Sequence, residues 1–133
     1  MSTMPRRLLY TLLLGSFVVL PASGCFLVAA GAGAGAVVAY TNRGASATIP
    51  GTVDALFDRA TNAFDGLQIA ETGRSTENSG ASRTLRGKTG DVEVTVELIR
   101  ASDQTTKVEV IAAKNVVEYD KELAKRVLDR IVP

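Results

Sequence analysis

The sequence predicts an α+β domain over residues 50–133, in which a four-stranded antiparallel sheet carries two helices on one face in the order α-β-β-β-β-α. Apolar side chains recur with the helical period of about 3.6 residues at both ends of this range, and with the strand period of about two residues between them. Each predicted element is apolar on one side only, so sheet and helices should bury these sides against one another.

The two helices are predicted from apolar residues at steps of three and four. The first has its apolar face at Val53, Leu56, Phe57, Ala60 and Phe64, and the second at Leu123, Ala124, Val127, Leu128 and Ile131. Pro50 favours a first helical turn, and Gly66 suits the left-handed conformation that ends many helices. Asp120 is the predicted N-cap of the second helix.

Strands are expected between the helices. Leu67–Glu71 alternates weakly and predicts the first strand, and Thr72–Ala81 is rich in Gly and Ser and is interpreted as a long loop. Asp91–Arg100 alternates strictly, with four apolar residues on the side that should be buried. The last strand is predicted over Thr106–Ala112, with Val108 and Val110 on the buried side.

Two registers follow from these patterns. A two-residue turn at Thr89–Gly90 would place Arg86 opposite Glu93, and Leu85 opposite Val94.

For the last pair of strands, Glu97 opposite Lys107 is preferred. The alternative shift by two residues places Glu97 opposite Glu109, which sets two like charges side by side.

Composition excludes several classes of function. The chain has 15 Lys and Arg against 14 Asp and Glu, so no basic field predicts a nucleic-acid partner. It has no His and a single Cys, which excludes an internal disulfide, Cys/His zinc sites and His-based catalytic triads. Glu93, Glu97 and Glu109 are interpreted as a solvated sheet face and not as the paired carboxylates of a glycosidase. We therefore expect no enzyme, no cofactor and no metal site.

Residues 1–24 predict a signal peptide. Arg6 and Arg7 precede the apolar stretch Leu8–Leu20, which is shorter than the ~20 apolar residues of a membrane-spanning helix and ends at Pro21. An uncleaved segment, extending through the apolar tract and anchoring the protein in the inner membrane, is the alternative.

Cys25 is the predicted lipidation site. The sequence Ala22-Ser23-Gly24-Cys25 resembles the lipobox of bacterial lipoproteins, although Ala22 stands where Leu is usual. The resemblance implies that the Cys25 thiol is acylated with diacylglycerol and becomes the mature N-terminus. The simpler alternative is a secreted protein cleaved by the ordinary signal peptidase. Lipoproteins that are kept in the inner membrane often carry Asp after the cysteine, whereas this sequence has Phe26. In this respect the sequence resembles lipoproteins of the outer membrane, which favours that membrane, facing the periplasm.

Residues 25–49 are interpreted as the lipidated cysteine, an apolar Gly/Ala tract to Tyr40 and a polar linker. As a helix the tract would span ~22 Å, less than the ~30 Å hydrocarbon core, so a tether against the bilayer is preferred to a span. Gly31 and Gly35 also have the spacing of self-associating membrane helices.

The lipobox-like sequence, the Gly/Ala tract and the closing helix together resemble a family of small bacterial lipoproteins described only as a domain of unknown function. The resemblance implies a fold and a location and brings no site residues. We therefore expect a membrane-anchored, non-enzymatic domain that contacts another envelope component. The alternative is a domain that binds a small molecule or lipid between its sheet and helices.

Overall fold

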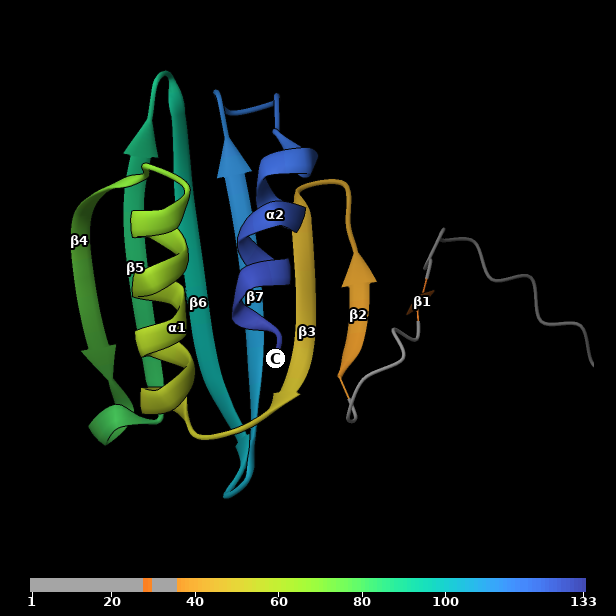
Figure 1. Ribbon diagram of the computed structural model, residues 1–133, viewed down its shortest axis with the longest axis vertical. Coiled ribbons are helices and arrows are strands. Elements are labelled where there is room, and N and C mark those ends of the chain that lie inside the picture. The colour runs from red at the N-terminus through yellow and green to blue at the C-terminus, as the bar shows by residue number, and fades with distance from the viewer. Residues whose placement is uncertain (1–27, 30–35) are drawn as a thin grey trace, which may run out of the picture.

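The computed structural model describes residues 28–29 and 36–133. These residues form one antiparallel sheet, with helices α1 (Val53–Gly66) and α2 (Lys121–Ile131) packed against each other on one of its faces (Figure 1). The predicted α+β class and the placement of both helices on one face are confirmed. No helix among the described residues is long and apolar enough to span a bilayer.

The sheet is larger than predicted. Six strands of four residues or more form it, and the two-residue strand β1 lies at one edge, so the prediction of four strands is wrong. Along the chain the strands are β1 Val28–Ala29, β2 Val37–Tyr40, β3 Gly44–Pro50, β4 Ala70–Glu77, β5 Ser82–Thr89, β6 Val92–Ser102 and β7 Thr105–Ala113. Their spatial order is β1-β2-β3-β7-β6-β5-β4.

The additional strands come from the segment that was interpreted as tract and linker. Strand β3 lies inside the sheet between β2 and β7, and it pairs with β7 along its whole length. Ala45, Ala47 and Ile49 are buried in the core, and helix α2 packs over this strand. The linker interpretation is therefore wrong for residues 44–49. Small alternating residues resemble a linker in composition, yet they fit under a helix where larger side chains would not.

Strand β4 also differs from the prediction. The chain turns at residues 67–69, and the strand then runs through most of the segment interpreted as a loop, ending at a single 3-10 turn over Asn78–Gly80. Nearly every residue of β4 is exposed, because β4 is an edge strand beyond the end of the core. An edge strand of this kind lacks the apolar alternation by which buried strands are recognised.

Both predicted registers are wrong by two residues, although the faces are right. The β5–β6 turn is Gly90–Asp91, with Gly90 at φ 59°, and Lys88 lies opposite Glu93. Between β6 and β7, Glu97 lies opposite Glu109, the pairing that the sequence disfavoured.

The core between the sheet and the helices is close to the one predicted. Both predicted apolar helix faces are buried, as are Val94, Val96, Val108 and Val110 of the central strands. Pro50 ends strand β3 and does not lie in the first turn of α1, so that prediction is wrong. Thr52 is the N-cap of α1, and its side chain accepts a hydrogen bond from the Ala55 backbone N–H. Asp120 caps α2 as predicted, with Oδ1 2.9 Å from the Leu123 nitrogen.

Candidate interaction surfaces

Cys25, the residue predicted to carry lipid, lies outside the described residues, as do the predicted signal peptide and most of the Gly/Ala tract. The polar strand residues that the sequence predicted lie within the described part of the chain. They lie on the face of the sheet away from the helices. We call this the open face; its central residues are Ser46, Thr84, Thr95, Glu97, Glu109 and Ile111. The described part of the chain places no element over it.

Two carboxylates lie at the centre of the open face. Glu97 of β6 and Glu109 of β7 are direct cross-strand partners and are both half-buried. Among the described residues, the one ion pair that either carboxylate forms is the contact of Lys107 Nζ with Glu109 Oε2 at 3.9 Å. Like charges directly opposite each other on neighbouring strands destabilise a sheet. This position therefore carries an energetic cost that a cation from outside could remove.

A hollow of about 300 Å³ lies on the sheet beside these carboxylates, over strands β4 to β6. It forms where a β-bulge shifts the register between Glu71 and Gly73. Its lining is polar and of mixed charge, consisting of Thr72, Gly73, Arg74, Ser75, Thr84, Arg86 and Glu93. The sheet thus brings Arg86 and Glu93 to one hollow, although they are not the direct partners that the sequence predicted.

Two arginines cover the core at the β4 side of the sheet. The Arg83 guanidinium carbon lies 3.8 Å from the centroid of the Phe57 ring, and that of Arg74 lies 5.6 Å from it. Arg83 Nη1 donates to Asp54 Oδ1 at 2.8 Å, and Arg74 donates two hydrogen bonds of 2.6 Å to Glu71. The hydrogen bonds from Arg74 lower the pKa of the Glu71 carboxyl. The two guanidinium groups cover this side of the core, and each lies over the Phe57 ring and pairs with a carboxylate.

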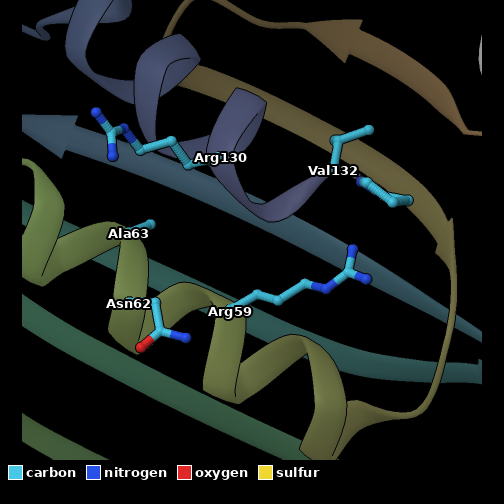
Figure 2. A pocket seen from close by; sticks show the side chains of 6 residues that line it. Arg59, Asn62, Ala63, Arg130 and Val132 are labelled. Atoms are coloured by element: carbon cyan, nitrogen blue, oxygen red, sulfur yellow. The ribbon is translucent and has the colours of Figure 1, made fainter.

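A groove of about 350 Å³ separates the two helices near the end of α2, and Arg59, Asn62, Ala63, Arg130, Val132 and Pro133 line it. Figure 2 shows Arg59 extending from α1 toward Val132, with Arg130 extending the other way. Arg59 Nη1 donates to the Ile131 carbonyl at 3.3 Å. Arg130 lies against Gly66, where an added Cβ would come within 2.5 Å of its Nη1. Arg59 therefore links the two helices by a hydrogen bond, and Arg130 packs against the end of α1.

The connection from β7 to α2 exposes two apolar side chains that sequence reasoning missed. Val116 is 90% exposed and Val117 85% exposed. Their signal in the sequence is an apolar pair between Asn115 and Glu118, in a segment with neither helical nor strand period. An apolar pair in such a segment has no predicted core to enter.

No group of three or more His, Cys, Asp or Glu residues in the described part of the chain is arranged to hold a metal ion. The three glutamates considered as catalytic carboxylates all lie on the open face, where Glu93 has Lys88 opposite it and Glu97 and Glu109 face each other.

One protein family matches the chain over residues 8–132, and its description is "Protein of unknown function (DUF3568)". The match covers nearly all of the 133 residues, so the chain belongs to this family. The predicted resemblance to a family of unknown function is confirmed. A comparison with curated proteins finds no match.

Proposed function

We propose that this member of the DUF3568 family is a lipid-anchored protein of the bacterial envelope, whose non-enzymatic domain acts by contact with another envelope component. The proposed anchor is a diacylglyceryl group on Cys25, and the proposed location is the periplasmic side of the outer membrane. The sequence of residues 1–26 supports both points, through the apolar stretch after Arg7, the small residues before Cys25 and the phenylalanine after it.

The fold shortens the tether that this proposal requires. Because β3 belongs to the sheet and β1 pairs with β2, only residues 26 and 27 separate Cys25 from Val28, the first described residue of the sheet. Three residue steps of about 3.5 Å give this tether a reach of at most ~11 Å. The domain is held within a thin layer next to the membrane, where even a weak interface meets a high local concentration of partner.

The observation that carries the contact proposal is the opposed pair of Glu97 and Glu109 on the open face. The two helices cover the other face of the sheet, and no element of the described chain covers this one, which could therefore meet a partner. A partner that places a lysine or arginine between the two carboxylates would relieve their repulsion in the bound state. The partner should therefore present a basic patch.

The alternative, binding of a small molecule or lipid between sheet and helices, would use the groove of Figure 2. Arg59 is already hydrogen-bonded to the opposite helix, and the guanidinium of Arg130 lies against Gly66 at the end of α1. Within residues 36–133 no basic side chain pairs with Glu97, which is why contact through the open face is preferred.

The anchor is tested by mass spectrometry of the membrane-bound protein. We expect a mature N-terminal peptide that begins at Cys25 and carries diacylglycerol, and we expect Cys25→Ser to accumulate as precursor. A mature protein with an unmodified Cys25, or one that retains Leu8–Leu20, would contradict the anchor. Recovery with inner-membrane markers on a density gradient would contradict the outer-membrane location only.

The contact is tested by charge reversal in cells, followed by cross-linking of intact envelopes and affinity purification. We expect Glu97→Lys to abolish the cross-linked partner. Asp58→Lys makes the same change in net charge on the exposed side of α1 and should leave the partner in place. Retention of the partner by Glu97→Lys, or its loss in both variants, would reject the open face as the contact.

A further inference from the structure

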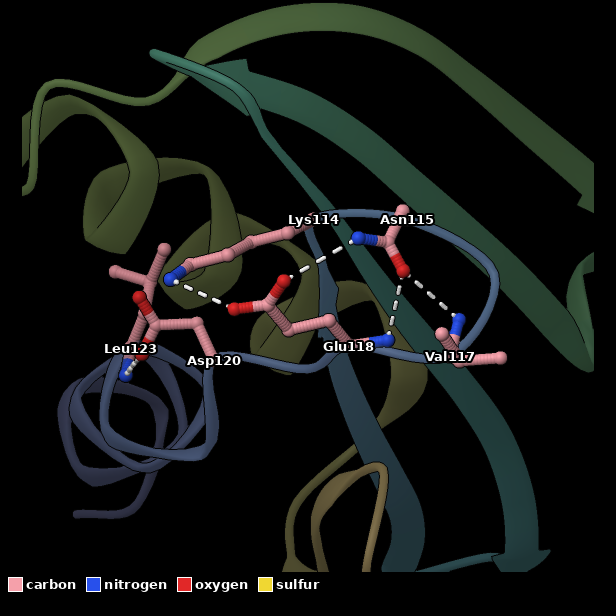
Figure 3. A network of polar contacts seen from close by, with 6 residues as sticks. All are labelled: Lys114, Asn115, Val117, Glu118, Asp120 and Leu123. Carbon is pink, nitrogen blue, oxygen red and sulfur yellow. Dashed lines mark hydrogen bonds and ion pairs between the residues drawn. The ribbon is translucent and has the colours of Figure 1, made fainter.

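The turn between β7 and α2 exposes its two valines in a fixed arrangement. Asn115 Oδ1 accepts hydrogen bonds from the backbone N–H groups of Val117 and Glu118, at 3.0 and 2.9 Å. Lys114 Nζ and Asn115 Nδ2 each donate to the Glu118 carboxylate, at 3.4 and 3.3 Å (Figure 3).

The backbone closes the same turn. The Lys114 N–H donates to the Glu118 carbonyl at 2.9 Å, and the Asp120 N–H donates to the Ala112 carbonyl at 2.8 Å. Tyr119 contributes its hydroxyl, which donates to the Val116 carbonyl at 3.3 Å. The polar groups of this turn are satisfied internally, while its apolar side chains face outward. A mobile loop would not hold two valines in that position.

The residues around the valines have the composition of a membrane interface. Tyr119 lies in the turn itself, and the turn before β3 brings Arg43 to the same end of the sheet, because Gly44 pairs with Ile111. Tyr40 and Lys121 line a shared hollow there. Tyrosines and basic residues around an apolar tip are typical of proteins at the headgroup level of a bilayer.

The acidic residues at this end are engaged in part. Glu118 pairs with Lys114, and Asp120 caps α2. Glu122, which lines the same hollow as Tyr40 and Lys121, and Asp91, in the β5–β6 turn, are exposed and form no ion pair within the described part of the chain.

The opposite end of the sheet is different. Its turns, Asp103–Gln104 and Asn78–Gly80, contain no large apolar residue, and the exposed apolar side chains nearest this end, Val37 and Ile99, lie in strands β2 and β6. Figure 1 shows these turns at the other end of the long strands from the β7–α2 connection.

The direction of β1 leads toward the valine end. Strand β1 runs antiparallel to β2, and Val28 lies opposite Ala39, next to Tyr40 and the turn at residues 41–43. Three residue steps separate Val28 from Cys25, a contour of at most about 11 Å. A lipid at Cys25 would therefore bring this end of the sheet close to the bilayer.

We propose that Val116 and Val117 dip into the surface of the bilayer and orient the anchored domain with this end of its sheet on the membrane. The inference rests on the proposed lipid anchor. A lipid surface fits better than a protein, because the two valines form a convex tip, whereas protein hot spots are desolvated in complementary pockets. Two valines inserted into the bilayer are too few to bring a protein to the membrane by themselves. They suffice to orient a protein that is already anchored there. In this orientation the sheet is upright on the membrane, so the bilayer does not cover the open face.

The test uses the full lipoprotein, purified from membranes and reconstituted in vesicles of phosphatidylethanolamine and phosphatidylglycerol. Val116→Cys is labelled with an environment-sensitive fluorophore. Cys25 is the only native cysteine, and as a thioether it would not react. We expect the emission of the label at residue 116 to be blue-shifted. Lipids that carry a spin label near the headgroup should quench this label several-fold more strongly than they quench a label at the control position. Gln104→Cys, at the opposite end of the sheet, is that control and should stay aqueous.

The outcomes separate the two proposals. Aqueous emission at residue 116, or equal quenching at residues 116 and 104, overturns the membrane contact and leaves the anchor intact. Shielding of residue 116 only after addition of an envelope protein extract also overturns it, in favour of a protein partner. Labelling of the wild-type protein shows a free Cys25 thiol, which removes the anchor and the inference together.

Discussion

At the scale of single residues, Gly87 sets how closely α1 approaches the sheet. It lies on the buried side of β5, opposite Val94. A Cβ at this position would come within 2.6 Å of the Phe64 ring and 2.7 Å of Ile69 Cγ2. Real Cβ atoms do not approach other atoms so closely, so any side chain at residue 87 must displace the end of α1.

Gly87→Ala should therefore lower the free energy of unfolding by roughly 1–3 kcal/mol, the usual cost of overpacking a core. Gly73→Ala is the matched control, because a Cβ at Gly73 meets nothing within 4 Å. Urea unfolding followed by circular dichroism measures both variants. Equal midpoints for the two would show that the end of α1 moves aside without cost.

At the scale of elements, packing decides the β6–β7 register against the charges. The observed register pairs Leu98 with Val108 and Val96 with Val110. The register preferred from the sequence would place Thr106 opposite Leu98. In the structure Thr106 lies opposite Arg100, and its hydroxyl donates to the Gly51 carbonyl at 2.9 Å. A cross-strand charge pair contributes about 0.2–1 kcal/mol. A buried hydroxyl without a partner costs about 1–3 kcal/mol, so the structure accepts the glutamate pair.

The pairing of Glu97 with Glu109 across β6 and β7 predicts how Glu97→Lys should change stability. The substitution turns a like-charge pair into an opposite-charge pair with Glu109, and we expect stability to rise by up to about 1 kcal/mol. Asp58→Lys, at an exposed position of α1 with no hydrogen bond or ion pair to the other described residues, should change stability little. Thermal unfolding at low and high salt measures the effect, which should shrink as salt screens it. A destabilised Glu97→Lys would mean that Glu109 is not its partner.

The elements that sequence could predict are those whose own apolar pattern is complete. Both helices and the strand from Val92 bury one full side, and their periods identify them. Strand β3 buries small residues under α2, and β4 buries little, so only the neighbouring strands reveal them. The candidate surfaces follow the same division. The glutamates of the open face were predicted from alternation, whereas the role of Val116 required the fold of its turn.

At the scale of the whole molecule, the sheet unites the segment before Pro50 with the segment after it. Strand β3 satisfies the backbone of β7 and fills the space under α2, and β2 in turn covers the edge of β3. The unit that folds therefore includes the described chain from Ala36 onward, which also brings the folded domain close to the proposed anchor.

Two truncated chains test this unity, one beginning at Ala36 and the other at Gly51, one residue after the domain start at Pro50 that the sequence predicted. The shorter chain loses Ala45, Ala47 and Ile49 from the core and exposes the whole edge of β7 as unpaired backbone. Exposed edges of long strands favour aggregation. We expect the chain from Ala36 to be monomeric and to unfold cooperatively, and the chain from Gly51 to aggregate or to lack a thermal transition. Size-exclusion chromatography and circular dichroism distinguish these results. Equal behaviour of the two chains would make β3 dispensable and return residues 44–49 to the role of a linker.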